Sequence, residues 1–175
     1  KEVRTVAGAY NEVHKRRDAL DAILRSAAET DALTGVQNRY CYEQYLLELS
    51  ESDCSGAVFL FDINFLKQTN DTKGHEAGDN LIRAVAECIV DCFGKDCFRL
   101  GGDEFAAIVK NCTHESVAEM IKRFESETKK RNVSVSFGWA YTYRIANTNL
   151  KFLMNEADQK MYEQKKRIHG NKGLL

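Results

Sequence analysis

Residues 99–105 place two glycines and two adjacent acids between two short apolar segments. The flanking segments, 96–100 and 105–109, are rich in residues that favour strands, and the glycines suit a turn, so this run predicts a β-hairpin that displays carboxylates. A glycine turn also relaxes the alternation of side chains along a strand, which lets Asp103 and Glu104 lie near one edge. Taken by itself, such a run is more often a solvated hairpin tip.

A second acidic position makes a cation site the stronger interpretation. Asp62 comes at the end of a continuous apolar run, residues 57–63, which is typical of a central strand buried on both faces. A carboxylate there is costly unless it is paired or bound to a metal. Two like charges about 4 Å apart repel by about 4 kcal/mol at an effective dielectric near 20, so gathered acids normally have a cation nearby. Magnesium suits such hard oxygen ligands and usually keeps phosphates among its ligands.

The expected elements follow the order helix, β-α-β-β-α-β, helix. We expect a short helix or turn at 64–70, a polar loop at 71–79, strands at 57–63, 96–100, 105–109 and 133–141, and helices at 39–50, 80–93, 115–130 and 150–168. With right-handed crossovers, this order predicts an α+β, ferredoxin-like sandwich of the palm type, with an antiparallel-centred sheet and helices on one face. The first strand and the hairpin are then neighbours, so Asp62 converges with Asp103 and Glu104, as in a metal site for nucleotidyl transfer.

The composition limits the classes of function. A chain of 175 residues accommodates one domain and a short appendage. Lys and Arg number 25 against 26 Asp and Glu, which gives a net charge of -1, so the basic field of a nucleic-acid-binding protein is missing. No apolar stretch reaches the length that spans a bilayer and the N-terminus lacks an apolar signal segment, so we expect a soluble chain without membrane contact.

The six cysteines form no Cys-x-x-Cys pair and lie mostly in apolar runs, which is typical of a reduced, cytosolic protein. Cys88 and Cys92 are one helical turn apart and could share a metal. No His joins them at ligand spacing, so we favour packing in the core.

The first 29 residues predict a separate N-terminal helix, followed by one domain over residues 30–175. Apolar residues recur there at heptad spacing, with an interruption at Arg17: Val3, Val6, Tyr10, Val13, Leu20, Leu24 and Ala27. One such seam needs a partner, either a second copy in a parallel coiled coil or the helix's own domain. We favour the coiled coil.

Four motifs, taken together, resemble a known family. They are residues 31–39 (Asp-Ala-Leu-Thr-Gly-Val-Gln-Asn-Arg), residues 61–71, Gly74-His75 with Gly78-Asp79, and residues 101–105. In this order and spacing they are similar to the GGDEF-domain diguanylate cyclases, over residues 31–166. The resemblance implies condensation of two GTP molecules into cyclic di-GMP and pyrophosphate, with Mg²⁺ or Mn²⁺, in a homodimer that holds one GTP per protomer. It also implies bacterial second-messenger signalling under an upstream sensor, in a cytoplasmic protein or the cytoplasmic part of a membrane-anchored one.

The resemblance also implies roles for individual residues. The metal would be bound by Asp62, the carbonyl of Ile63, Asp103 and Glu104. Asp103 would also help to deprotonate the attacking 3′-hydroxyl, and Lys67 would neutralise charge on the phosphates, although a solvated surface lysine is the alternative.

Further residues would bind the substrate. Asn70 and Asp79 would read the guanine edge, because an amide and a carboxylate match its acceptor and its two donors. Asp79 could equally be the N-cap of the helix expected from Asn80. The same family pattern places Phe65, Leu66 and Lys165 in the substrate site.

The chain departs from the family pattern in four places. Asn64 replaces a second acid, Leu66 replaces a phenylalanine, and residues 168–171 (Ile-His-Gly-Asn) replace Gly-Arg-Asn, so that a phosphate contact from an arginine is missing. The Arg-x-x-Asp motif of product inhibition would fall on Cys92 and Lys95, so tight feedback at that place is not expected.

Two other functions compete with catalysis. A degenerate GGDEF domain would bind GTP or cyclic di-GMP without turnover, but the intact residues of the site argue against it. A purely structural dimerisation module would explain the N-terminal helix and not the motifs.

Overall fold

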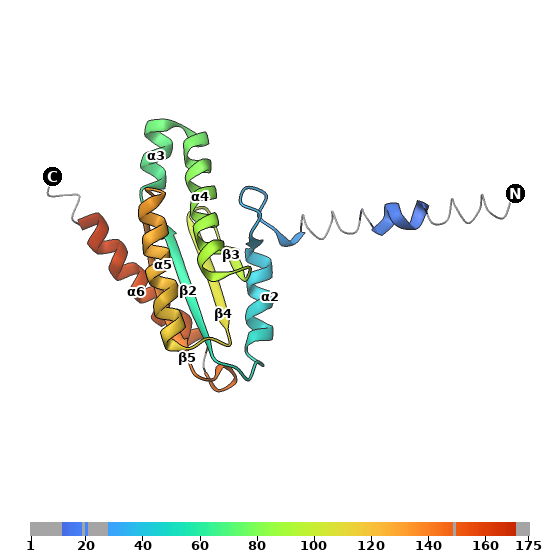
Figure 1. Cartoon of the computed structure of the whole chain (residues 1–175). Coiled ribbons are helices and arrows are strands. Elements are labelled where there is room, and N and C mark those ends of the chain that lie inside the picture. Colours follow the sequence, from blue (N-terminus) through green and yellow to red (C-terminus); the bar gives the residue numbers. More distant parts are fainter. Residues whose placement is uncertain (1–11, 19, 21–27, 149, 171–175) are drawn as a thin grey trace, which may run out of the picture.

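A computed structural model describes residues 12–18, 20, 28–148 and 150–170, and Figure 1 shows their arrangement. Residues 12–18 are helical. The further elements are β1 (Gln37–Asn38), α2 (Arg39–Leu49), β2 (Gly56–Ile63), α3 (Leu66–Lys73), α4 (His75–Phe93), β3 (Cys97–Arg99), β4 (Glu104–Lys110), α5 (His114–Lys130), β5 (Val135–Thr142), a 3₁₀ turn at Ile145–Asn147 and α6 (Leu150–Gly170).

The sheet has the order β1-β3-β4-β2-β5. Strand β2 lies between β4 and β5 and is antiparallel to both, β3 is antiparallel to β4, and the short β1 is parallel to β3. The predicted β-α-β-β-α-β sandwich is therefore confirmed, with one additional edge strand.

Helices cover both faces of the sheet, and the prediction of helices on one face is wrong. Phe59 and Phe61 of β2 belong to a core with α4 and α5, whereas Val58 and Leu60 belong to a second core with α2 and α6. All eight residues of β2 are buried. A continuous apolar strand needs cover on both sides, and the helices that flank the β-α-β-β-α-β unit provide it on the second side.

Two helices replace the polar loop that we expected at 71–79. Helices α3 and α4 form a hairpin broken at Gly74, which has a left-handed φ of 86°. Asp79 therefore lies inside α4 and is not the N-cap of a helix beginning at Asn80. Glycine and polar residues normally favour a loop, but the packing of the two helices against each other outweighs these weak local preferences.

Two side chains of α6 form hydrogen bonds with backbone groups at the outer edge of β5. Lys160 Nζ donates a hydrogen bond to the carbonyl of Trp139 at 2.9 Å, and the amide of Phe137 donates to Gln164 Oε1. Exposed edge groups invite pairing with other strands, so these two contacts protect the edge of the sheet.

The cysteine prediction is confirmed for the core. Cys88, Cys92, Cys97 and Cys112 are free and buried. Burial raises the pKa of Cys88 to about 11 and that of Cys97 to about 12, so both thiols stay protonated near neutral pH and behave as small apolar groups.

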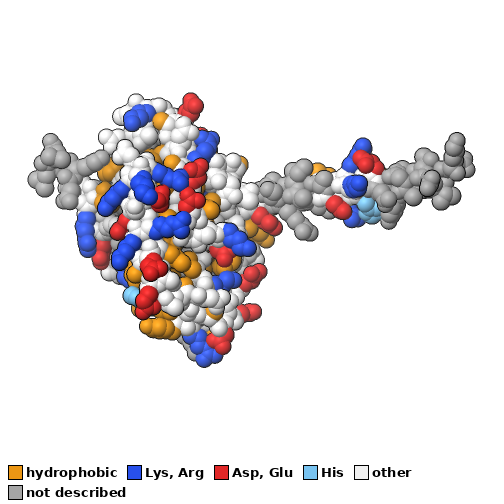
Figure 2. Space-filling model, viewed as in Figure 1, with side chains coloured by type: hydrophobic (Ala, Val, Ile, Leu, Met, Phe, Trp, Pro, Cys, Tyr) orange, Lys and Arg blue, Asp and Glu red, His pale blue; other side chains and the backbone are white. Residues whose placement is uncertain are grey.

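The surface carries both signs of charge. Positive and negative side chains are interspersed over the face shown in Figure 2. Arg131, for example, contacts Glu87 and Asp91 at 2.7 Å each. In the described part of the chain, no helix is long and apolar enough to cross a membrane.

Two positions of the predicted N-terminal seam are described, Val13 and Leu20, with 66% and 55% of their surfaces exposed. The domain does not bury them, and the partner of this seam stays a prediction. The other seam residues, Val3, Val6, Tyr10, Leu24 and Ala27, lie outside the described residues.

The contact between β5 and α6 yields a stability prediction at Gly138. A Cβ at this position would overlap the backbone of Ala157 and Met161, so Gly138→Ala must push α6 away from the sheet. We expect a loss of about 1–3 kcal/mol in the free energy of unfolding, measured by urea denaturation. Gly170→Ala is the control, since a Cβ at Gly170 meets no described atom within 4 Å. Equal stability of the two variants would contradict the close packing.

Candidate active site

The sheet brings the predicted acidic residues together at one end of β2 and β4. Asp62 lies directly opposite Glu104 in the antiparallel register. The next residue, Ile63, donates its backbone N–H to the carbonyl of Asp103 at 3.0 Å. The convergence expected from two separate strands is thus present.

Asp62 is the most constrained of these residues. Its side chain is buried, and Oδ2 accepts a hydrogen bond from Lys165 Nζ at 2.6 Å. Oδ1 is also buried and has no hydrogen-bond partner among the described residues. Burial raises the pKa of Asp62, Lys165 opposes that shift, and the nearby Asp103 adds to it. Leaving a buried carboxylate oxygen unpaired costs about 1–3 kcal/mol or more, so the site favours an added cation.

The donor set fits magnesium. Asp62, Asp103 and the carbonyl of Ile63 offer hard oxygen atoms, and Mg²⁺ typically takes one or two carboxylates and completes its shell with water and phosphate. Within the described ranges, no three Asp, Glu, His or Cys side chains are close enough to hold a metal by themselves. Glu104 is exposed, and its Oε2 lies 3.6 Å from where a Cβ on Gly101 would be, so its carboxylate rests over the turn.

A pocket of about 580 Å³ opens beside the acids. The predicted residues Phe65, Leu66, Lys67 and Lys165 all line it, together with Ile63, Gln68, Asp71, Thr72, Asp103 and His169. Two cationic side chains and an acidic edge therefore face one space, which suits a phosphorylated ligand held with a metal ion.

The start of α3 adds a further anion-binding element. Phe65, which precedes the helix, has φ 63° and ψ 20°, a left-handed conformation that is uncommon for a bulky residue. Such a conformation costs about 1–3 kcal/mol and persists where the surroundings enforce it, commonly at functional sites. The phenyl ring of Phe65 has no acceptor atom that could cap the first N–H groups of α3. The N–H groups at the N-terminus of a helix attract phosphates.

The two residues predicted to read guanine lie on neighbouring helices. Asn70 is on α3 and Asp79 is on α4, and neither lines the pocket described above. The Asn70 amide packs against Gly78, where its Oδ1 occupies the space that a Cβ would take. The helical hairpin thus brings Asn70 next to the residue that precedes Asp79.

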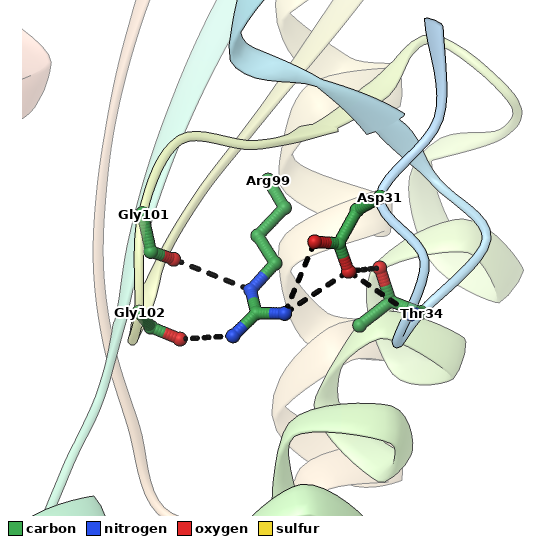
Figure 3. A network of polar contacts seen from close by, with 5 residues as sticks. All are labelled: Asp31, Thr34, Arg99, Gly101 and Gly102. Carbon is green, nitrogen blue, oxygen red and sulfur yellow. Dashed lines mark hydrogen bonds and ion pairs between the residues drawn. The ribbon is translucent and has the colours of Figure 1, made fainter. Parts of the chain in front are cut away.

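An ion pair holds the Gly-Gly turn, and sequence reasoning did not identify it. Arg99 Nη1 contacts Asp31 Oδ1 at 3.0 Å and Oδ2 at 3.2 Å, while its other nitrogens donate to the carbonyls of Gly101 at 3.3 Å and Gly102 at 2.8 Å (Figure 3). Thr34 donates two further hydrogen bonds to Asp31. The only signal in the sequence is that Asp31 opens the first motif and Arg99 lies two residues before the motif at 101–105.

The Asp31 carboxylate is stabilised in its charged form. Burial by itself would raise its pKa, but hydrogen bonds from Thr34 and the charge of Arg99 lower the pKa overall. The side chains of Arg99 and Asp31 are 13% and 24% exposed, so solvent screens this pair less than the surface pairs. The loop before β1 and the hairpin turn are therefore linked by a partly buried contact.

Asp31→Asn tests this link. The amide removes the charge that pairs with Arg99, so we expect faster amide hydrogen exchange in residues 99–104 and a loss of about 1–3 kcal/mol in the free energy of unfolding. Asp53→Asn is the matched control, because the ion pair of Asp53 with Arg144 is exposed and should contribute less than about 1 kcal/mol. If both variants exchange like the unsubstituted protein in 99–104, the ion pair does not hold the turn.

Comparison with known proteins identifies the family of the chain. The family model described as "Diguanylate cyclase, GGDEF domain" matches residues 28–171. The chain is 32% identical to the cyclic di-GMP phosphodiesterase PdeB of Shewanella oneidensis, over 77% of this chain and 17% of that protein. It is 31% identical to diguanylate cyclase A of Treponema denticola, over 78% of this chain and 41% of that protein. The chain thus spans less than half the length of either relative.

The fold is shared with a solved structure. The crystal structure of the coiled coil and GGDEF domain of DgcB from Caulobacter crescentus, in complex with c-di-GMP, matches with a TM-score of 0.79 at 27% identity, covering 92% of each chain. The family model, the relatives and this fold lead to one conclusion: the chain belongs to the GGDEF-domain family.

Proposed function

We propose that this domain is an active diguanylate cyclase, which condenses two GTP molecules into cyclic di-GMP and two pyrophosphates. Membership of the family supports a role in cyclic di-GMP signalling, and the site supports the catalytic form of it. The observation that carries the proposal is the buried Asp62, whose Oδ1 has no partner in the described part of the chain, beside a pocket lined by Lys67 and Lys165. A buried carboxylate kept at this cost suits a metal ion that neutralises the phosphates during nucleotidyl transfer.

Asp62, Asp103 and the carbonyl of Ile63 would hold Mg²⁺ or Mn²⁺, with Glu104 joining them after its side chain turns from Gly101. When bound, the metal ion would neutralise part of the negative charge of the triphosphate. Asp103 lines the pocket and accepts the proton of the attacking 3′-hydroxyl.

Cationic groups of the chain bind the phosphates. Lys67, in the first turn of α3, stabilises the charge that develops on them as pyrophosphate leaves. Lys165 already pairs with Asp62 and lies close enough to the pocket to contact a phosphate as well.

The reaction needs two copies of the domain, because each holds one of the two GTP molecules. We propose that the N-terminal helix supplies the contact as a parallel coiled coil over residues 1–29. The exposure of Val13 and Leu20 supports this, since a seam left uncovered by its own domain is free to pack against a second copy. An upstream sensor would act through the same helix.

A binding module without turnover is the second candidate. A relative with 32% identity carries the name of a cyclic di-GMP phosphodiesterase, so similar domains occur in proteins named for the opposite reaction. The two candidates differ in one measurement, namely whether purified protein with GTP and Mg²⁺ forms cyclic di-GMP.

We also propose weak feedback by the product at the position before the hairpin. Cys92 is buried, and Lys95 is exposed. Neither residue offers the guanidinium and carboxylate that would clamp a guanine and its phosphate.

Asp62→Asn and Asp103→Asn should each lower cyclic di-GMP formation about 100-fold or more, measured by chromatography of the products. Asp62→Asn should also keep its free energy of unfolding within about 1 kcal/mol or raise it. The raised pKa of Asp62 shows that the fold disfavours its charged form, and the amide removes that cost. The exposed Asp158, on α6, offers the control Asp158→Asn. Turnover near that of the unsubstituted protein in either variant would remove that acid from the site.

Gly78→Ala tests the role of Asn70 in reading guanine. The new Cβ displaces the Asn70 amide, so the preference for GTP over ATP in competition binding should fall about tenfold. Because alanine has a higher helix propensity than glycine, we expect the thermal stability of the Gly78→Ala variant to stay unchanged or rise while its selectivity for GTP falls. Asn70→Ala should give the same loss, and the double variant no more than either single one. Additive losses would mean that Gly78 acts by another route.

A further inference from the structure

Asn64 lies buried at the turn between β2 and α3, and the proposed mechanism gives it no role. The residue is 2% exposed. Its Nδ2 donates to Ser134 Oγ at 3.1 Å, and its Oδ1 accepts from Ser136 Oγ at 2.8 Å. These two bonds fix the orientation of the amide, so that Oδ1 presents an acceptor toward any third partner.

His169, in the last turn of α6, provides that partner. Its Nε2 lies 3.1 Å from Asn64 Oδ1, and because Oδ1 can only accept, Nε2 carries the proton and donates. The imidazole also stacks on the ring of Phe65, with centroids 4.6 Å apart and planes 21° from parallel. One side chain therefore contacts two consecutive residues of the turn that leads into α3.

The stacked residue is the one with the left-handed backbone. Phe65, with φ 63°, sets the direction in which α3 starts, and a bulky residue keeps such a conformation only where its neighbours enforce it. The stacked His169 holds the Phe65 side chain, and Asn64, held on three sides by hydrogen bonds, fixes the preceding residue. His169 and Phe65 both line the pocket, together with Leu66 and Lys67.

We propose that His169 is a positioning residue, which ties the end of α6 to residues 64–66 and so holds the N-terminus of α3 in the shape that receives a nucleoside triphosphate. The identity of the ligand rests on the proposed function, whereas the mechanical link does not. The link makes nucleotide affinity depend on the end of α6, far along the chain from the turn that contacts the phosphates. Since His169 is exposed, its removal should loosen the turn without unfolding the domain.

Three variants separate the two contacts. His169→Phe keeps the stacked ring and loses the hydrogen bond, His169→Gln keeps a donor and loses the ring, and His169→Ala loses both. Arg167→Ala is the matched control, because Arg167 is an exposed cation two residues earlier on α6. The first measurement is amide hydrogen exchange over residues 63–69, without nucleotide. The second is binding of a non-hydrolysable GTP analogue with Mg²⁺, together with kcat and KM for GTP.

We expect His169→Ala to speed exchange in residues 63–69 several-fold and to weaken binding of the analogue about tenfold, with KM rising more than kcat falls. His169→Phe and His169→Gln should lie between, and Arg167→Ala should match the unsubstituted protein. Exchange and affinity unchanged in His169→Ala would overturn the proposal. Exchange that rises in His169→Ala while the unsubstituted protein binds no GTP analogue would support the link and overturn the proposed function instead.

Discussion

A buried carboxylate at the end of a fully buried strand is the constraint on which this site depends. Asp62 follows an apolar run that needs cover on both faces, and only 7% of its side chain is exposed. Lys165 satisfies one of its oxygens, and Asp103 adds a second negative charge nearby. The domain holds this unfavourable group because two cores, one on each side of β2, stabilise the strand that carries it.

The loops around this group are held by contacts from distant parts of the chain. Arg99 and Asp31 join the hairpin turn to the loop before β1 across 68 residues of sequence. His169 and Asn64 join the end of α6 to the start of α3 across 105 residues. In the first case, Asp31 pairs with Arg99, which donates hydrogen bonds to the carbonyls of Gly101 and Gly102. In the second, His169 contacts the side chains of Asn64 and Phe65 at the start of α3. Positioning of this kind is what a site that aligns phosphates with a nucleophile requires.

The proposed dimer contact lies in the N-terminal helix, away from the residues of the site. Each domain contributes one pocket, and the exposed Val13 and Leu20 lie on a helix at the opposite end of the sequence from α6. A signal could therefore alter how two sites meet without changing the site itself. Asp31 comes directly after the segment predicted as the N-terminal helix, residues 1–29, and its ion pair with Arg99 links that part of the sequence to the turn beside the acids.

Local residue patterns determined the strand order, the acidic hairpin and the family, because alternation, apolar runs and motif spacing are properties of neighbouring residues. They did not show that helices α2 and α6 cover the second face, or that residues 71–79 are helical, because tertiary packing outweighed weak local preferences there. The ion pair of Arg99 with Asp31 and the stacking of His169 on Phe65 also needed the structure. Such contacts join residues that only the folded sheet brings together, and no pattern along the chain encodes their distance.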